Sequence, residues 1–217
     1  MKYTHCFFDL DGTVIDSSPG ITHSVQYALE HMGITPPPAE TLYGFIGPSL
    51  MWGFSNFYHM DEENSRRAVA LYRENYSARG MYECTPYEGI EALLRALNDA
   101  HIVCVLATCK PHIYANGILR HLHLDRYFAF VSGPELDGTR DSKEEVIAYA
   151  AEHLGICDLT RSAMIGDRGS DMVGATHHAM DALGVLWGFG EREELEKAGA
   201  DAICSTVSEL SSMLLAK

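Results

Sequence analysis

The chain has 217 residues, of which 47% are hydrophobic and 21% are charged, as is typical of a globular protein with a substantial core. No apolar run approaches about 18 residues, which excludes a transmembrane helix, and the formal net charge of −14 argues against binding to a nucleic-acid backbone. An anionic ligand would therefore need local positive charge, most simply a divalent cation. The first residues lead into an apolar strand rather than a signal peptide, and the six cysteines contain no Cys-x-x-Cys pair, so we expect a cytoplasmic protein with free thiols.

The first third of the chain is predicted to contain one buried strand followed only by helices. The apolar residues 4–8 form this strand, and Asp9 stands at its end. Apolar residues then recur with helical spacing in three segments, at about 19–32, 50–58 and 61–79. Residues 15–84 are therefore predicted to be almost entirely helical.

From Pro86 onward, strands and helices alternate. Strands are predicted at 102–107, 128–131, 163–165, 183–187 and 201–204. Helices are predicted at about 87–99, 111–122 and 142–154, and at the end of the chain. Continuous apolar strands that alternate with helices indicate a parallel sheet with helices on both faces. We therefore expect an α/β fold: a doubly wound parallel sheet formed by residues 1–14 and 85–217, with an all-helical domain inserted at 15–84.

Polar residues follow the predicted strands at the edge where doubly wound sheets bind ligands. Asp9 and Asp11 are two residues apart in an extended segment, so their carboxylates point to the same side and need a cation or a proton between them. Thr108 ends the second predicted strand, where a hydroxyl and free backbone amides are typical of a phosphate cradle. A helix cap would explain Thr108 equally well.

Two later segments carry further charged candidates. Lys143 stands in the first turn of a predicted helix, where a cation is unfavourable unless it faces an anion, although an ordinary surface lysine is the simpler interpretation of this feature alone. Asp167 directly follows a predicted strand, and Asp171 comes four residues later. Together with Asp9 and Asp11 they would form an oxygen-rich site suited to magnesium, whereas Asp171 alone could equally cap a helix.

The order and spacing of these four segments resemble the haloacid dehalogenase-like hydrolase superfamily, and the inserted helices resemble its first type of cap domain. The matching residues are Asp9-Leu10-Asp11-Gly12-Thr13, Thr108, Lys143, and Gly166-Asp167 with Asp171. Three further segments look like the phosphoglycolate phosphatase-type branch: Asp16-Ser17-Ser18-Pro19, Gly47-Pro48 and residues 184–190. Two positions depart from that branch, since Cys109 replaces a frequent asparagine and Glu144-Glu145 follow Lys143 in place of a Lys-Pro-x-Pro pattern.

The resemblance implies a phosphoric monoester hydrolase that acts on a small ester such as 2-phosphoglycolate. Asp9 would be the nucleophile that forms an aspartyl-phosphate, and Asp11 would be the general acid and base. Mg²⁺ would be bound by the side chains of Asp9 and Asp167 and by the backbone carbonyl of Asp11. Thr108, Cys109 and Lys143 would bind the phosphate, and Asp171 would orient Lys143 or the waters of the metal.

The cap loop Gly44, Phe45, Ile46 and Gly47 is the candidate for substrate contact, although a plain turn between helices explains it as well. Residues 15–65 contain no Lys or Arg, which disfavours a leaving group with a second strong negative charge.

Several alternatives remain open from the sequence. A β-phosphoglucomutase-like phosphomutase, a 5'-nucleotidase or a pyrophosphatase could use the same scaffold, and a phospho-receiver-like signalling module also uses Asp, Thr and Lys. A zinc site at the paired histidines is disfavoured, because they lack suitably spaced Cys or acidic ligands. We expect a small-molecule phosphate ester as partner, no nucleic acid and no membrane, and either a monomer or a homodimer.

Overall fold

The computed structural model describes residues 2–216, which form two compact units. The sheet unit consists of residues 2–15 and 86–216, and the helical unit is Asp16–Thr85. Two short strands, β2 (Ile15–Asp16) and β3 (Thr85–Pro86), pair where the chain passes between the units.

The sheet unit is built on a parallel sheet, which in the described residues has six strands in the order β5-β4-β1-β6-β7-β8. The strands are β1 (His5–Phe8), β4 (Val103–Ala107), β5 (Phe130–Ser132), β6 (Ser162–Gly166), β7 (Asp181–Val185) and β8 (Ala202–Cys204). The chain leaves β1 in one direction through β4 and β5, then returns to the other side through β6, β7 and β8. The order of strands thus reverses at β1, where doubly wound sheets bind ligands.

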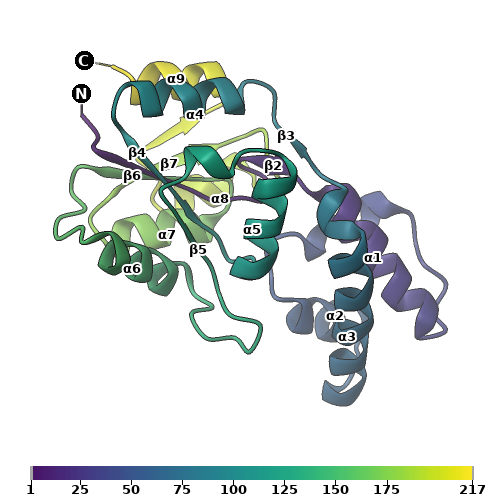
Figure 1. The fold of residues 1–217 in the computed structure, drawn as a ribbon. Helices are drawn as coiled ribbons and strands as arrows, with labels where there is room; N and C mark the ends of the chain where they lie inside the picture. Colours follow the sequence, from purple (N-terminus) through teal and green to yellow (C-terminus); the bar gives the residue numbers. More distant parts are fainter. Residues whose placement is uncertain (1, 217) are drawn as a thin grey trace. The chain divides into compact units, whose positions relative to one another are not determined.

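Helices cover both faces of this sheet, which explains why its strands are almost wholly apolar. They are α4 (Ile90–Asp99), α5 (His112–His121), α6 (Lys143–Leu154), α7 (Gly169–His177), α8 (Arg192–Lys197) and α9 (Val207–Leu214). In Figure 1, α4 and α9 lie on one side of the sheet and α6 and α7 on the other. Phe7, Val105 and Met164 from three adjacent strands are fully buried in one cluster with Val146 and Ile147 of α6. The expected doubly wound α/β fold is confirmed.

The helical unit contains α1 (Ser18–His31), α2 (Leu50–Tyr58) and α3 (Glu62–Ala78), together with the 3-10 helices η1 (Ala39–Phe45) and η2 (Gly80–Tyr82). Gly20 of α1 lets the backbone of η2 approach closely, since a Cβ there would lie 1.9 Å from the carbonyl oxygen of Gly80. On α3, the rings of Tyr72 and Tyr76 stack with centroids 5.2 Å apart and are buried.

The structure differs from the sequence prediction in several elements, among them η1, α8 and β5. Residues 39–45 form η1 where a connector and a loop are predicted; Pro38 precedes it, and its carbonyl accepts a hydrogen bond from the Thr41 amide. The helix α8 is not predicted, because Leu195 is its one buried residue and leaves no apolar period. The strand β5 begins two residues late, since a 3-10 turn, η3 (Asp125–Tyr127), comes directly before it.

None of the helices between residues 2 and 216 combines the length and the apolar character that a bilayer crossing requires.

Candidate active site

Three strand ends of the sheet unit converge on one edge. Asp9 follows β1, Thr108 follows β4 and Asp167 follows β6. The parallel register sets these positions level: the Asp9 amide donates to the carbonyl of Ile165 at 2.9 Å, and the Thr108 amide donates to that of Ser132 at 3.0 Å. The sheet therefore brings together side chains from segments far apart in the sequence.

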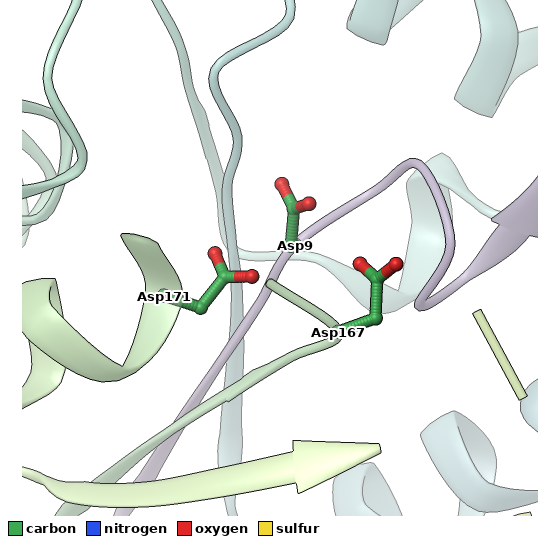
Figure 2. Close-up of side chains that lie close together, drawn as sticks. All are labelled: Asp9, Asp167 and Asp171. Carbon is green, nitrogen blue, oxygen red and sulfur yellow. The ribbon is translucent and has the colours of Figure 1, made fainter. Parts of the chain in front are cut away.

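Three carboxylates gather at this edge (Figure 2). Asp9, Asp167 and Asp171 each offer an oxygen that lies within 4.8 Å of the other two. Asp167 and Asp171 are 0% and 1% exposed, and Asp9 is also buried. Buried like charges at this spacing repel unless a cation or a proton compensates them.

Lys143 supplies one such cation from the first turn of α6. Its ammonium Nζ lies 2.9 Å from Asp9 Oδ1 and 2.8 Å from Asp171 Oδ1, and it donates to the carbonyl oxygen of Ala107 at 2.8 Å. Gly174 of α7 makes room for the lysine stem, since a Cβ there would lie 2.6 Å from Lys143 Cγ. Burial lowers the pKa of Lys143, but the charges of Asp171 and Asp9 outweigh this and raise its pKa well above the ordinary value. At 3% exposure Lys143 is a buried cation, so the interpretation as a surface lysine is wrong.

Asp167 is held by uncharged donors. Its Oδ2 accepts from the Phe189 amide at 2.8 Å, and its Oδ1 accepts from the Thr13 hydroxyl at 3.4 Å. Burial, and then the negative charges of Asp171 and Asp9, raise the pKa of Asp167 to about 8. Gly12 and Gly188 pack against this carboxylate, where an added Cβ would lie 2.1 Å and 2.5 Å from its Oδ2. Asp167 is thus the acid in the cluster whose charge most needs a further cation.

Asp171 has two roles. Its Oδ2 accepts the Arg168 amide at 3.0 Å, which caps α7, while its Oδ1 pairs with Lys143. Burial raises the pKa of Asp171 to about 6, and Lys143 opposes the rise. Asp171 therefore closes the first turn of α7 and also pairs with the buried lysine of the carboxylate cluster.

The loop after β4 adds a hydroxyl and a second lysine. Thr108 Oγ1 accepts the Lys110 amide at 3.1 Å, so the Thr108 hydroxyl proton remains available for an anionic ligand. Lys110 Nζ lies 2.9 Å from Asp11 Oδ2. Asp11 Oδ1 is buried and has no hydrogen-bond partner among residues 2–216. Cys109 lies between Thr108 and Lys110 in the sequence and is a neutral thiol, because burial raises its pKa to about 11.

Sequence reasoning missed the parts played by Lys110, Thr13 and Phe189. The signal for Lys110 is its place in the same loop as Thr108, two residues on. Phe189 lies in the segment 184–190 that looks like phosphoglycolate phosphatase, but it acts through its backbone amide, which no residue pattern identifies.

The proposed substrate loop lies in the helical unit. Phe45 is buried, and its ring centroid lies 5.1 Å from that of Phe54 and 5.2 Å from that of Phe57. Ile46 is buried as well, whereas Gly44 and Gly47 are exposed. Phe45 therefore contributes to the packing of the helical unit, and contact of this loop with a substrate stays a prediction.

Comparison with known proteins places this geometry in a family context. A model of the family described as haloacid dehalogenase-like hydrolase matches residues 6–185. A 5'-nucleotidase of Pseudomonas aeruginosa is 39% identical over 99% of this chain and 96% of its own length. The tyrosine-protein kinase PtkA of Mycobacterium tuberculosis is 34% identical over 94% of this chain and 69% of its own length.

A phosphoglycolate phosphatase of Neisseria gonorrhoeae is 29% identical over 85% of this chain and 80% of its own length. Among solved structures, that of a predicted phosphatase from Clostridium acetobutylicum is 43% identical, covers 98% of both chains and has a TM-score of 0.92.

Proposed function

Because this chain belongs to the haloacid dehalogenase-like hydrolase family and is a phosphatase of the phosphoglycolate phosphatase type, we propose that it hydrolyses a small phosphate monoester by covalent transfer to Asp9. The observation that carries the proposal is the place of the Asp9 carboxylate. It lies at the carboxyl end of the central strand, beside the buried cation Lys143 and within reach of Asp167. A carboxylate placed in this way can act as a nucleophile toward phosphorus.

The proposed reaction has two steps. In the first, an oxygen of Asp9 attacks phosphorus, the bond from phosphorus to the leaving oxygen breaks, and Asp11 gives that oxygen a proton. In the second, water attacks the phosphorus of the aspartyl-phosphate and Asp11 takes up the proton of the water. Inorganic phosphate leaves, and the Asp9 carboxylate is restored.

Phosphoryl oxygens carry the charge that the site must hold. The Lys143 ammonium lies beside Asp9 and places a positive charge next to these oxygens. The Thr108 hydroxyl can donate a hydrogen bond to them from the loop after β4. Cys109 is next to Thr108 and is neutral, so its backbone amide rather than its thiol is the group suited to an anion. Charge that is in place before the reaction is the main source of rate enhancement at such sites.

A divalent cation fits the donors at this edge. Asp9 and Asp167 supply the hard carboxylate oxygens that Mg²⁺ prefers, the Asp11 carbonyl completes the proposed set, and Asp171 orients Lys143 beside it. The raised pKa of Asp167 marks a carboxylate that lacks a compensating charge. When bound, Mg²⁺ would neutralise phosphoryl oxygens and screen Asp9 from the incoming dianion.

Two substrate classes deserve the first tests. A small ester such as 2-phosphoglycolate follows from the likeness to phosphoglycolate phosphatases. A nucleoside monophosphate is the second candidate, favoured by the likeness to a 5'-nucleotidase over 99% of this chain. Residues 15–65 contain no Lys or Arg, and this favours an uncharged nucleoside as leaving group over glycolate, which carries a carboxylate. Contact of the cap loop Gly44 to Gly47 with the leaving group belongs to this proposal.

The test measures phosphate release from p-nitrophenyl phosphate, 2-phosphoglycolate, nucleoside monophosphates, pyrophosphate and β-glucose 1-phosphate, with Mg²⁺ and with EDTA. We expect turnover that needs the metal and that Asp9→Asn abolishes. Unchanged activity in Asp9→Asn would remove the nucleophile assignment. Conversion of the sugar phosphate to its isomer without phosphate release would favour a mutase.

A further inference from the structure

Lys110 is a buried lysine for which the two-step reaction has no use. Its side chain is 6% exposed, and its ammonium pairs with Asp11 Oδ2 at 2.9 Å. Long cationic side chains are rarely buried without a specific partner. The partner here is the group proposed to move protons, so the pair lies within the reacting part of the site.

The loop that carries Lys110 is fixed at both ends. The Thr108 amide donates to Ser132, and the His112 amide donates to Pro134, at 3.0 Å each. Gly133 permits this approach, since a Cβ there would lie 2.4 Å from the carbonyl oxygen of Lys110. The ammonium of Lys110 is therefore held by a rigid loop that also carries the Thr108 hydroxyl.

The two oxygens of Asp11 are in different states. Oδ2 is taken by Lys110, whereas Oδ1 is buried and has no hydrogen-bond partner among the described residues. A buried carboxylate oxygen without a donor is unusual, and it marks an atom that a ligand group can meet. The pairing thus decides which oxygen of Asp11 is free.

We propose that Lys110 is a positioning residue, which fixes Asp11 by Oδ2 and so presents Oδ1 as the oxygen that exchanges protons with the leaving group and with water. This inference rests on the proposed function. Because Lys110 and Thr108 share one loop, the proton-transferring oxygen and the phosphoryl-binding hydroxyl keep a constant relative position. Such constancy matters, since a misplacement of about 1 Å at a reacting group costs about 100-fold in rate.

The nature of the leaving group separates this role from a structural one. An alkoxide leaves only with a proton from Asp11, whereas p-nitrophenolate leaves without one. A lysine that acts through Asp11 should therefore matter far more for alkyl esters. A lysine that binds the phosphoryl group, or that merely supports the fold, should affect both esters equally.

The experiment compares kcat/KM for p-nitrophenyl phosphate and for the alkyl monoester that the wild type hydrolyses best, both with saturating Mg²⁺. The variants are Lys110→Met, Lys110→Gln and Lys110→Arg, with Lys197→Met as control because Lys197 pairs with Glu193 on the surface of α8. We expect Lys110→Met and Lys110→Gln to lose about 100-fold with the alkyl ester and less than about tenfold with p-nitrophenyl phosphate. Lys110→Arg should restore part of the alkyl-ester activity, and the control should match the wild type.

Equal losses for the two esters would overturn the proposal, as would a loss confined to KM. A thermal melting curve first shows which variants are folded. If Lys110→Met does not fold, the comparison of the two esters is made with Lys110→Gln. The proposed function is checked separately, by wild-type turnover of p-nitrophenyl phosphate and its loss in Asp9→Asn. A wild type that releases no phosphate would refute the function itself, whereas equal losses would refute only the role of Lys110.

Discussion

Lys143 Nζ lies 2.9 Å from Asp9 Oδ1, although 134 residues separate the two in the sequence. Both side chains are buried, and the same ammonium also pairs with Asp171. One cation thus offsets two of the four acids proposed for the site. Asp11 pairs with Lys110, and the carboxylate of Asp167 is left for the proposed metal ion.

Replacing Lys143 by Met should remove the buried charge while keeping most of the side-chain volume. We expect kcat/KM for p-nitrophenyl phosphate to fall about 1000-fold, because the group proposed to hold the phosphoryl oxygens is lost. The free energy of unfolding in urea should fall by about 3 kcal/mol, since Asp9 and Asp171 lose their common partner. Lys197→Met, on the surface of α8, serves as control. Wild-type kcat/KM in Lys143→Met would contradict the role given to this lysine.

The response of stability to Mg²⁺ tests Asp167 without any measurement of activity. Mg²⁺ should raise the melting temperature of the wild type, since a ligand that binds only the native state stabilises it. Asp167→Asn should melt higher than the wild type in EDTA, because it removes a buried carboxylate from beside Asp9 and Asp171. The same variant should gain little from added Mg²⁺. An equal gain in both proteins would place the metal elsewhere.

Gly12 and Gly33 form a matched pair for a packing test, since both have a φ of +78°. A Cβ at Gly33 would have no atom within 4 Å, whereas one at Gly12 would lie 2.1 Å from Asp167 Oδ2. Gly33→Ala should therefore lower the free energy of unfolding by about 1 kcal/mol, from backbone strain alone, and leave activity unchanged. Gly12→Ala should cost more than about 2 kcal/mol in the free energy of unfolding and at least about 100-fold in kcat/KM, because it displaces Asp167. Equal effects of the two substitutions would show that Asp167 tolerates displacement.

The sequence was sufficient for the parts of the site that depend on where strands end. Asp9, Thr108 and Asp167 each follow an apolar run, and a parallel sheet brings such ends to one edge. Lys143 could be suspected because a cation in a first turn opposes the helix dipole.

Contacts set by loops could not be predicted in this way. Lys110 resembles any other lysine until the paths of two loops are known, and the amide of Phe189 has no counterpart in the residue pattern. The 3-10 helix η1 was missed because its seven residues contain two buried side chains, Leu42 and Phe45, too few to show a period.

Asp181 should make stability depend on pH at a place remote from the chemistry. The Tyr3 hydroxyl donates to Asp181 Oδ2 at 2.6 Å, and Lys2 pairs with the same oxygen. Burial raises the pKa of Asp181, but the hydrogen bonds from Lys2 and Tyr3 outweigh it and hold the pKa below the ordinary 3.8. Because the folded state favours the charged form, this stabilisation is fully present above about pH 4 and is lost as the pH falls through the lowered pKa.

We therefore expect Asp181→Asn to lower the free energy of unfolding in urea by about 1 kcal/mol at pH 7. The difference from the wild type should stay constant down to about pH 5 and shrink below about pH 4, where the wild-type carboxylate takes up its proton. Asp99→Asn is the control, because Asp99 is an exposed carboxylate at the end of α4. A difference that grows as the pH falls would have the wrong sign and would show that Asp181 is more stable protonated in the folded protein.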